Sequence, residues 1–118
     1  MAEPSFGRII LDARKQKGYS QSYLAKLLNL DFTYLSKLEN DRAPYPPSEA
    51  VIQSLTEKLD LPNLNELIYL AGRIPQADED FLKQNYKEIT PVLRRMQEDS
   101  TFAQRVFREA KQLEDEEE

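Results

Sequence analysis

Residues 20–42 read SQSYLAKLLNLDFTYLSKLENDR, a stretch with the spacing of two short helices joined by a tight turn. Apolar residues three or four positions apart lie on the same face of a helix. On that basis, Leu24 and Ala25 lie on the inner face of the first helix. Leu35 and Leu38 lie on the inner face of the second, so the stretch predicts two helices that pack against each other.

The turn between these helices is marked by Asn29, at a position where the chain needs a left-handed backbone conformation. Glycine usually fills such positions, and asparagine is one of the few residues that can replace it. Asp31 is the predicted N-cap of the second helix, because its carboxylate can accept the unpaired N–H groups of the first turn. These two residues set where the first helix ends and the second begins.

The second helix has an outer face of aromatic, hydroxyl and cationic side chains. This face consists of Phe32, Thr33, Tyr34, Ser36 and Lys37. A short helix with such a face is typical of one that enters the major groove of DNA. We expect Tyr34 at a phosphate or a neighbouring helix and the other four at base edges; core packing is the alternative for the two aromatic residues. No Asn or Gln is available for bidentate pairing with adenine, so no operator sequence follows.

Six residues of this stretch resemble the helix-turn-helix pattern of the phage-repressor family, also called the Cro or XRE family. They are Gln21, Ala25, Asn29, Leu35, Leu38 and Glu39. Upstream, FGRIILDARKQKGYSQ is similar to the first helix of that family, and downstream, PPSEAVIQSLTEKLDLPNLNELIYLAGRIP is similar to its fourth and fifth helices. The family has glycine where this chain has Asn29. The resemblance covers residues 6–75 and implies an all-α fold with a five-helix, lambda-repressor-like DNA-binding domain.

The resemblance also implies roles for individual polar residues. Gln21 would grip a phosphate or support the second helix, whereas the alternative is an ordinary first-turn residue. Arg14 and Glu39 would form a partly buried ion pair, whereas the alternative is two unrelated surface charges. Arg42, just after the second helix, is a further candidate for a phosphate contact unless it only balances the negative end of the helix dipole.

The composition of the chain limits its chemistry. It has 118 residues, no cysteine and no histidine. Disulfides are therefore excluded, and the usual parts of zinc sites and of cysteine or serine–histidine nucleophiles are missing. We expect no enzyme activity, no metal and no cofactor. With no apolar run of about 18 residues, we expect no membrane association, and without an apolar leader in MAEPSFGR we expect a cytoplasmic location.

The net charge of −5 is unevenly distributed along the chain. Residues 1–73 carry nine Lys or Arg and nine Asp or Glu, whereas residues 74–118 carry seven and twelve. Seven of the nine cations in the first part precede residue 43. Attraction to phosphate depends on the local placement of charge more than on the net charge. The acidity of the whole chain therefore does not argue against DNA binding.

Further helices are predicted on both sides of the central pair. One covers residues 4–17, and two more lie between residues 48 and 72. The first of these two has Ile52 at the edge of a core face formed by Val51, Leu55 and Leu59. Asn63, followed three residues later by Glu66, predicts a capping box at the start of the next. Residues 1–75 thus form the predicted DNA-binding domain.

Residues 76–118 are predicted to be a separate helical segment with an acidic end at residues 114–118. Thr90 before Pro91 predicts one helix start, and Thr101 with Gln104 predicts another. The last helix is too apolar to face water alone, so it packs on the first domain or on a second copy. We favour a second copy, because a two-fold dimer reads a palindrome. The predicted dimerisation residues are Phe102, Val106, Phe107, Ala110 and Leu113.

Two functional hypotheses follow. The first is a sequence-specific DNA-binding transcriptional regulator, a homodimeric repressor on a palindromic operator in double-stranded DNA. The alternative is an antitoxin-like or adaptor protein whose C-terminal helices bind another protein, since some members of the resembled family are partnered with toxins or regulatory peptidases. Salt distinguishes the two, because phosphate binding weakens steeply as salt rises and apolar docking does not.

Overall fold

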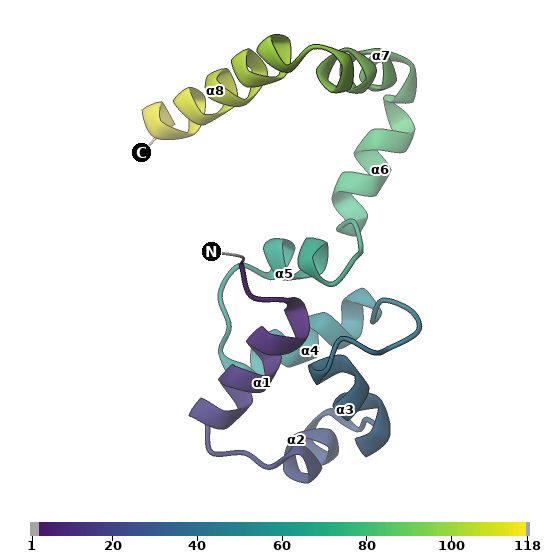
Figure 1. Ribbon diagram of the computed structural model, residues 1–118, viewed down its shortest axis with the longest axis vertical. Helices are drawn as coiled ribbons and strands as arrows, with labels where there is room; N and C mark the ends of the chain where they lie inside the picture. The colour runs from purple at the N-terminus through teal and green to yellow at the C-terminus, as the bar shows by residue number, and fades with distance from the viewer. Residues whose placement is uncertain (1–2, 118) are drawn as a thin grey trace. The chain divides into compact units, whose positions relative to one another are not determined.

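The structure is a computed structural model that describes the backbone of residues 3–117 and the side chains of residues 3–112. Figure 1 shows that the secondary structure of the described residues is helical throughout, in elements α1 to α8. The predicted all-α class is therefore confirmed. The chain divides into two compact units, Met1–Gln76 and Ala77–Glu118.

The first unit contains five helices. They are α1 (Phe6–Gln16), α2 (Gln21–Leu28), α3 (Phe32–Glu39), α4 (Glu49–Leu59) and α5 (Leu64–Leu70). Serine hydroxyls cap α1, α2 and α4, each accepting the N–H of the residue three positions on. The capping box predicted at Asn63 and Glu66 is wrong. Asn63 adopts a left-handed conformation with φ of 61°, and its side chain makes no cap hydrogen bond to α5.

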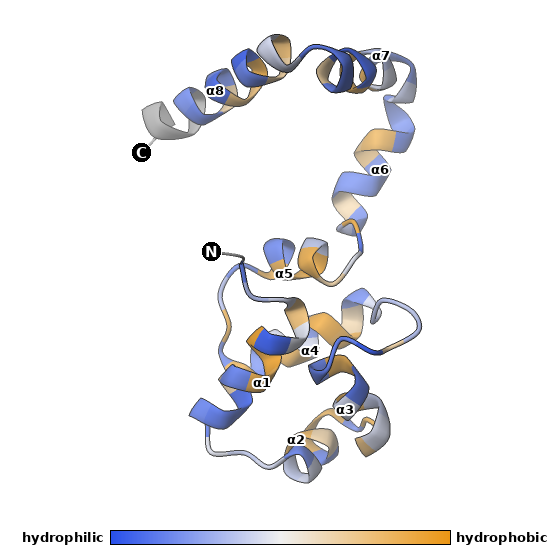
Figure 2. Ribbon diagram, in the orientation of Figure 1, coloured by the Kyte–Doolittle hydropathy of each residue, from blue (hydrophilic) through white to orange (hydrophobic). Residues whose placement is uncertain are grey.

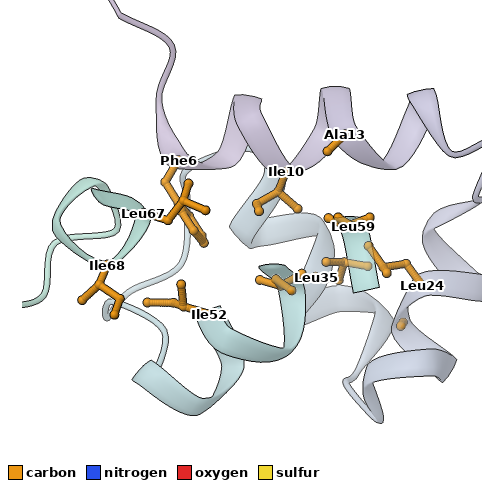
Figure 3. Close-up of a cluster of buried hydrophobic side chains, with 11 residues drawn as sticks. Phe6, Ile10, Ala13, Leu24, Leu35, Ile52, Leu59, Leu67 and Ile68 are labelled. Atoms are coloured by element: carbon orange, nitrogen blue, oxygen red, sulfur yellow. The ribbon is translucent and has the colours of Figure 1, made fainter. Parts of the chain in front are cut away.

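The core of the first unit draws at least one fully buried side chain from each of its helices. These side chains are Ile10, Leu24, Leu35, Ile52, Leu55 and Ile68. Figure 2 shows hydrophobic residues on α1 and α4, and Figure 3 shows buried side chains from all five helices, such as Ile10, Leu35 and Ile68, in one cluster. Burying each such side chain stabilises the fold by roughly 1.5–3 kcal/mol. The helices are therefore held by a shared core.

The predicted core face of α4 is correct at Leu55 and Leu59, which are buried, but wrong in its choice between Val51 and Ile52. Ile52, expected at its edge, is fully buried, whereas Val51 is only half-buried. The buried residues of α4 are Ile52, Leu55, Thr56 and Leu59. Two adjacent faces of α4 have apolar residues at helical spacing, so the sequence pattern alone does not decide which of them is buried.

The start of α1 is hydrogen-bonded to Asp41, which lies two residues after the end of α3. Asp41 accepts hydrogen bonds from the Ser5 hydroxyl at 2.5 Å and from the Gly7 N–H at 3.0 Å. A side chain on Gly7 would not fit, since its Cβ would lie 2.7 Å from the Asp41 carboxylate and still nearer to the Leu38 carbonyl. Asp41 itself has φ of 55°, which turns the chain out of α3. This contact was not predicted from the sequence.

The second unit contains α6 (Gln76–Gln84), α7 (Tyr86–Glu98) and α8 (Ser100–Glu117). The helix start predicted at Thr90 and Pro91 is wrong, because both residues lie inside α7. The helix begins earlier because the Asn85 carbonyl accepts hydrogen bonds from the N–H groups of Glu88 and Ile89. Thr90 also donates its hydroxyl proton to the Tyr86 carbonyl at 2.8 Å. This hydrogen bond lies within the turn of α7 that precedes Pro91.

The capping box predicted at Thr101 and Gln104 is also wrong. Helix α8 starts at Ser100, two residues earlier than a cap at Thr101 would place it, and Asp99 precedes it in an extended conformation. The Asp99 carboxylate accepts the Phe102 N–H at 3.1 Å and so caps the first turn of α8. An aspartate can fill this position as well as a threonine can, and the sequence offered both.

The second unit buries little apolar surface within itself. Of its described hydrophobic side chains, Ala103 is the one that is buried. Phe81 is 61% exposed and Phe107 is 49% exposed, and other large apolar side chains of α7 are also accessible. Figure 2 shows hydrophobic positions recurring between hydrophilic ones along these helices. Among the described residues, no helix has the length and apolar character needed to cross a membrane.

Candidate nucleic-acid interface

The turn between α2 and α3 has the geometry that Asn29 predicts. Asn29 has φ of 55° and ψ of 42°, in the left-handed region. The Leu30 N–H donates to the Ala25 carbonyl at 2.8 Å, and the Asn29 N–H donates to the Lys26 carbonyl at 3.1 Å. These bonds satisfy carbonyls at the end of α2 that have no partner within the helix. The chain is thereby redirected at once into α3.

Asp31 fixes the start of α3. Its carboxylate accepts hydrogen bonds from the backbone N–H groups of Thr33 at 2.8 Å and Tyr34 at 3.3 Å. Buried side chains at Leu35 and Leu38 hold the inner face of the same helix against the core. The position and rotation of α3 are therefore set from both its first turn and its inner face.

The outer face of α3 is accessible. Phe32 is 49% exposed, so it is not a core residue, and Thr33 and Lys37 are exposed as well. Tyr34 and Ser36 are half-buried at the edges of this face. No carboxylate in the described part of the chain pairs with Lys37. The five residues predicted for the outer face of α3 thus present a mixed apolar and polar surface.

A groove of about 420 Å³ runs beside this face. It is lined by Asp31, Thr33, Tyr34, Lys37, Pro44, Tyr45 and Pro46. The proline-rich loop at residues 43–47 therefore forms one wall of the groove, and Tyr45 is 78% exposed on it. The run of prolines predicts a stiff, non-helical connection, but nothing in the sequence alone places it beside α3. The accessible surface is wider than the helix itself.

Behind α3, Arg14 and Glu39 form a buried ion pair. Arg14 donates from Nε to Glu39 Oε2 at 2.6 Å and from Nη2 to Glu39 Oε1 at 2.9 Å. The remaining nitrogen, Nη1, donates to the Tyr19 carbonyl at 2.8 Å. The Glu39 side chain has no exposed surface, and that of Arg14 is 10% exposed. The pair joins α1 to the last residue of α3.

Gln21 joins the same network from α2. Its side-chain nitrogen donates to Glu39 Oε1 at 2.9 Å. Among the described residues, every buried side-chain nitrogen and oxygen has a hydrogen-bond partner, so the network is complete. Three helices are therefore connected through the single carboxylate of Glu39. Gln21 supports α3 in this structure, and it is half-buried at the start of α2.

Arg42 lies just beyond α3, after the left-handed turn at Asp41. Its backbone N–H donates to the Lys37 carbonyl at 2.8 Å, which closes the end of the helix. Its side chain is exposed and has no ion-pair partner among the described residues. Two exposed cations, Lys37 and Arg42, therefore lie in the last turn of α3 and just beyond its end.

The predicted dimerisation residues belong to the second unit. On α8, Phe102 and Val106 are half-buried, and Phe107 and Ala110 are exposed. Leu113 and the acidic run at residues 114–118 lie outside the side chains that the structure describes. In the described region, no group of three or more acidic side chains is arranged to hold a metal ion.

Comparison with known families bears on residues 10–62, which match the sequence model of the helix-turn-helix family. This segment is a helix-turn-helix domain of the phage-repressor (XRE) type. The resemblance inferred from residues 6–75 is thereby confirmed over the matched range, which spans α2, α3 and α4. A domain of this type supports DNA binding and transcriptional regulation as the role of the matched segment. A search of curated proteins found no significant match to the chain.

Proposed function

We propose that this protein is a dimeric transcriptional repressor that binds a palindromic operator in double-stranded DNA. The observation that carries the proposal is the exposed face of α3, held from behind by a buried network and by the core. A helix fixed in this way can enter the major groove without rearrangement.

Base reading is assigned to four residues of that face. Thr33 can donate or accept a hydrogen bond, and its methyl group can contact a thymine methyl. Phe32 offers apolar contact only, and Ser36 offers a hydroxyl one turn further on. Lys37 can reach a guanine or a phosphate, depending on the angle at which the helix enters. Tyr34, at the edge of the face, contacts the sugar-phosphate backbone in this proposal.

Phosphate contacts set the position of the domain on the duplex. The free N–H groups at the start of α2 form a natural anion site, and Gln21 lies there. Arg42 is exposed beyond α3 and provides a positive charge without an ion-pair partner in the described chain. These contacts carry no sequence information, but they fix the register in which the α3 side chains meet the bases.

Dimerisation would lengthen the stretch of DNA that the protein can read. Helix α3 has eight residues and is about 12 Å long, which matches only three to four base pairs. Two copies related by a two-fold axis would read two half-sites. The dimer is assigned to Phe102, Val106, Phe107, Ala110 and Leu113 of α8. Repression then follows because the bound dimer blocks RNA polymerase at the promoter.

Selection of bound sequences from a random DNA pool tests this proposal. We expect enrichment of two inverted half-sites whose centres are about 10 base pairs apart, or a multiple of one helical turn. Sedimentation of the free protein should show a dimer at the concentration used. Enrichment of a single unpaired half-site would contradict the palindrome, and no enrichment would contradict sequence-specific binding.

The exposed apolar side chains of the second unit also fit docking to a different protein, such as a toxin or a regulatory peptidase. Phe81 and Tyr86 are both more than half exposed and lie outside α8. If such a partner were the main ligand, its affinity would change little with salt, whereas operator affinity falls steeply. Salt-insensitive binding of such a partner, in the absence of sequence-specific DNA binding, would favour this second function.

A further inference from the structure

Two arginines gather around one aromatic ring where α7 meets α8. The guanidinium carbon of Arg95 lies 4.1 Å from the centroid of the Phe102 ring, and that of Arg105 lies 5.9 Å from it. The two guanidinium carbons are therefore at most about 10 Å apart, the sum of the two distances. Cations attracted to the same ring also repel each other, so this arrangement favours an anion between or beside them.

No such anion is supplied by the part of the chain whose side chains are described. Neither Arg95 nor Arg105 has a carboxylate within ion-pair distance there. Of the acidic residues nearby along the chain, Glu98 and Glu109 form no ion pair with either arginine, and Asp99 accepts the Phe102 N–H and caps α8. Arg94 and Arg108 are likewise exposed without ion-pair partners among the described residues. Arg95 and Arg105, the two arginines around the Phe102 ring, therefore form a small basic patch where α7 meets α8.

The sequence carries a matching acidic run. Residues 81–112 have seven Lys or Arg and four Asp or Glu, whereas all five residues at 114–118 are acidic. Arginine binds carboxylates well because its planar N–H groups match their geometry. Along a helix, Arg105 and residue 114 are separated by about 13 Å at 1.5 Å per residue. The acidic run therefore cannot reach the patch of its own helix while that helix stays straight.

We propose that Arg95 and Arg105 bind the acidic run, residues 114–118, of a second copy of this chain. The inference rests on the proposed dimer and specifies the relative orientation of its two α8 helices. An antiparallel pair of α8 helices brings the acidic end of each copy to the basic patch of the other, whereas a parallel pair brings like charges together. The site occurs twice because a two-fold interface is self-complementary. Val106, Phe107 and Ala110 lie between the two charged ends, as an apolar centre with a charged rim.

Charge reversal of the full-length chain tests the proposal. One variant carries Arg95→Glu and Arg105→Glu, and the other carries lysine at each of residues 114–117. Each variant alone faces like charge in its own homodimer, so its dimer dissociation constant should rise at least about tenfold at low salt. Mixed together, the two variants face opposite charge at both sites. The mixture should form a heterodimer with a dissociation constant within about threefold of the wild-type value.

Sedimentation with one variant fluorescently labelled measures both quantities, and circular dichroism checks that each variant remains helical. The matched control is Lys87→Glu with Lys111→Glu, which changes the charge by the same amount away from the ring of Phe102. This control should weaken the dimer less than the arginine variant does.

Reversal variants that dimerise as tightly as the wild type would overturn the inference, and so would the absence of heterodimer preference. If the arginine variant instead dimerises normally but loses operator affinity, the patch binds DNA phosphates, and the inference is again wrong. A wild-type protein that stays monomeric at all concentrations would overturn the proposed dimer itself, which is a separable result.

Discussion

The carboxylate of Glu39 is the point at which the helix-turn-helix domain should be most sensitive to substitution. Glu39→Ala removes the acceptor of three hydrogen bonds, two from Arg14 and one from Gln21. The guanidinium of Arg14 would remain, with its side chain 10% exposed and the Tyr19 carbonyl as its only retained partner in this network. An unpaired charge in such surroundings is poorly solvated.

The expected loss of stability is about 3–5 kcal/mol, the usual cost of breaking a buried ion pair from one side. For a domain of this size each kcal/mol lowers the melting temperature by about 4–8 °C, so a decrease of at least about 12 °C is expected. Urea denaturation followed by circular dichroism measures the change directly. A matched control is Asp12→Ala, which removes an exposed ion pair with Arg8 and should cost less than about 1 kcal/mol.

A double substitution separates the charge from the packing. Arg14→Met with Glu39→Leu removes both charges and retains apolar volume, so it should recover much of the stability lost in Glu39→Ala. The midpoint in urea should then move back towards the wild-type value at an unchanged denaturant slope. A midpoint unaffected by Glu39→Ala would refute the reasoning, because it would mean that the buried pair contributes nothing to holding α1 and α3 together.

Three further outcomes are expected. Gly7→Ala should destabilise the domain by roughly 2 kcal/mol or more in urea denaturation, since its Cβ meets backbone carbonyls that cannot move away easily; equal stability would contradict the tight contact. Asn29→Gly should leave the melting temperature unchanged or slightly raised, because glycine adopts the left-handed turn at least as readily. Thr33→Ala should relax base preference at one operator position, whereas Arg42→Ala should weaken all sites alike and reduce the salt dependence by about one phosphate contact, as measured by binding titrations on operator variants.

The central part of the fold could be read from the sequence because its signals are local. The left-handed turn at Asn29 and the cap at Asp31 depend on residues within a few positions of each other, and both are present as predicted. The Arg14–Glu39 contact joins residues far apart along the chain. Spacing alone did not indicate it, and it was expected only through the family resemblance.

The parts that could not be predicted depend on contacts between distant segments or on competing caps. Asp41 can accept hydrogen bonds from the start of α1 only because the end of α3 lies close to it in the fold. No local sequence pattern indicates that these two helix ends are close. The predicted helix starts in the second unit were wrong for another reason. Threonine before proline is a frequent cap signal, but here Asn85 opens the helix one turn earlier, so the proline falls inside it.

The candidate interface likewise has one part that could be predicted from the sequence and one part that could not. The outward residues of α3 follow from helical periodicity, and their exposure agrees with that reading for Phe32, Thr33 and Lys37. The groove between α3 and the loop that carries Tyr45 does not follow from periodicity, because the path of a proline-rich loop is set by the helices that it connects.

The shared carboxylate behind α3 has a consequence for the thermodynamics of DNA binding. Because α1, α2 and α3 meet at one fully bonded group, the helix that faces the duplex is already ordered in the free protein. Little backbone entropy should be lost there when a complex forms, so the heat-capacity change on binding should match rigid docking, without the larger value typical of coupled folding.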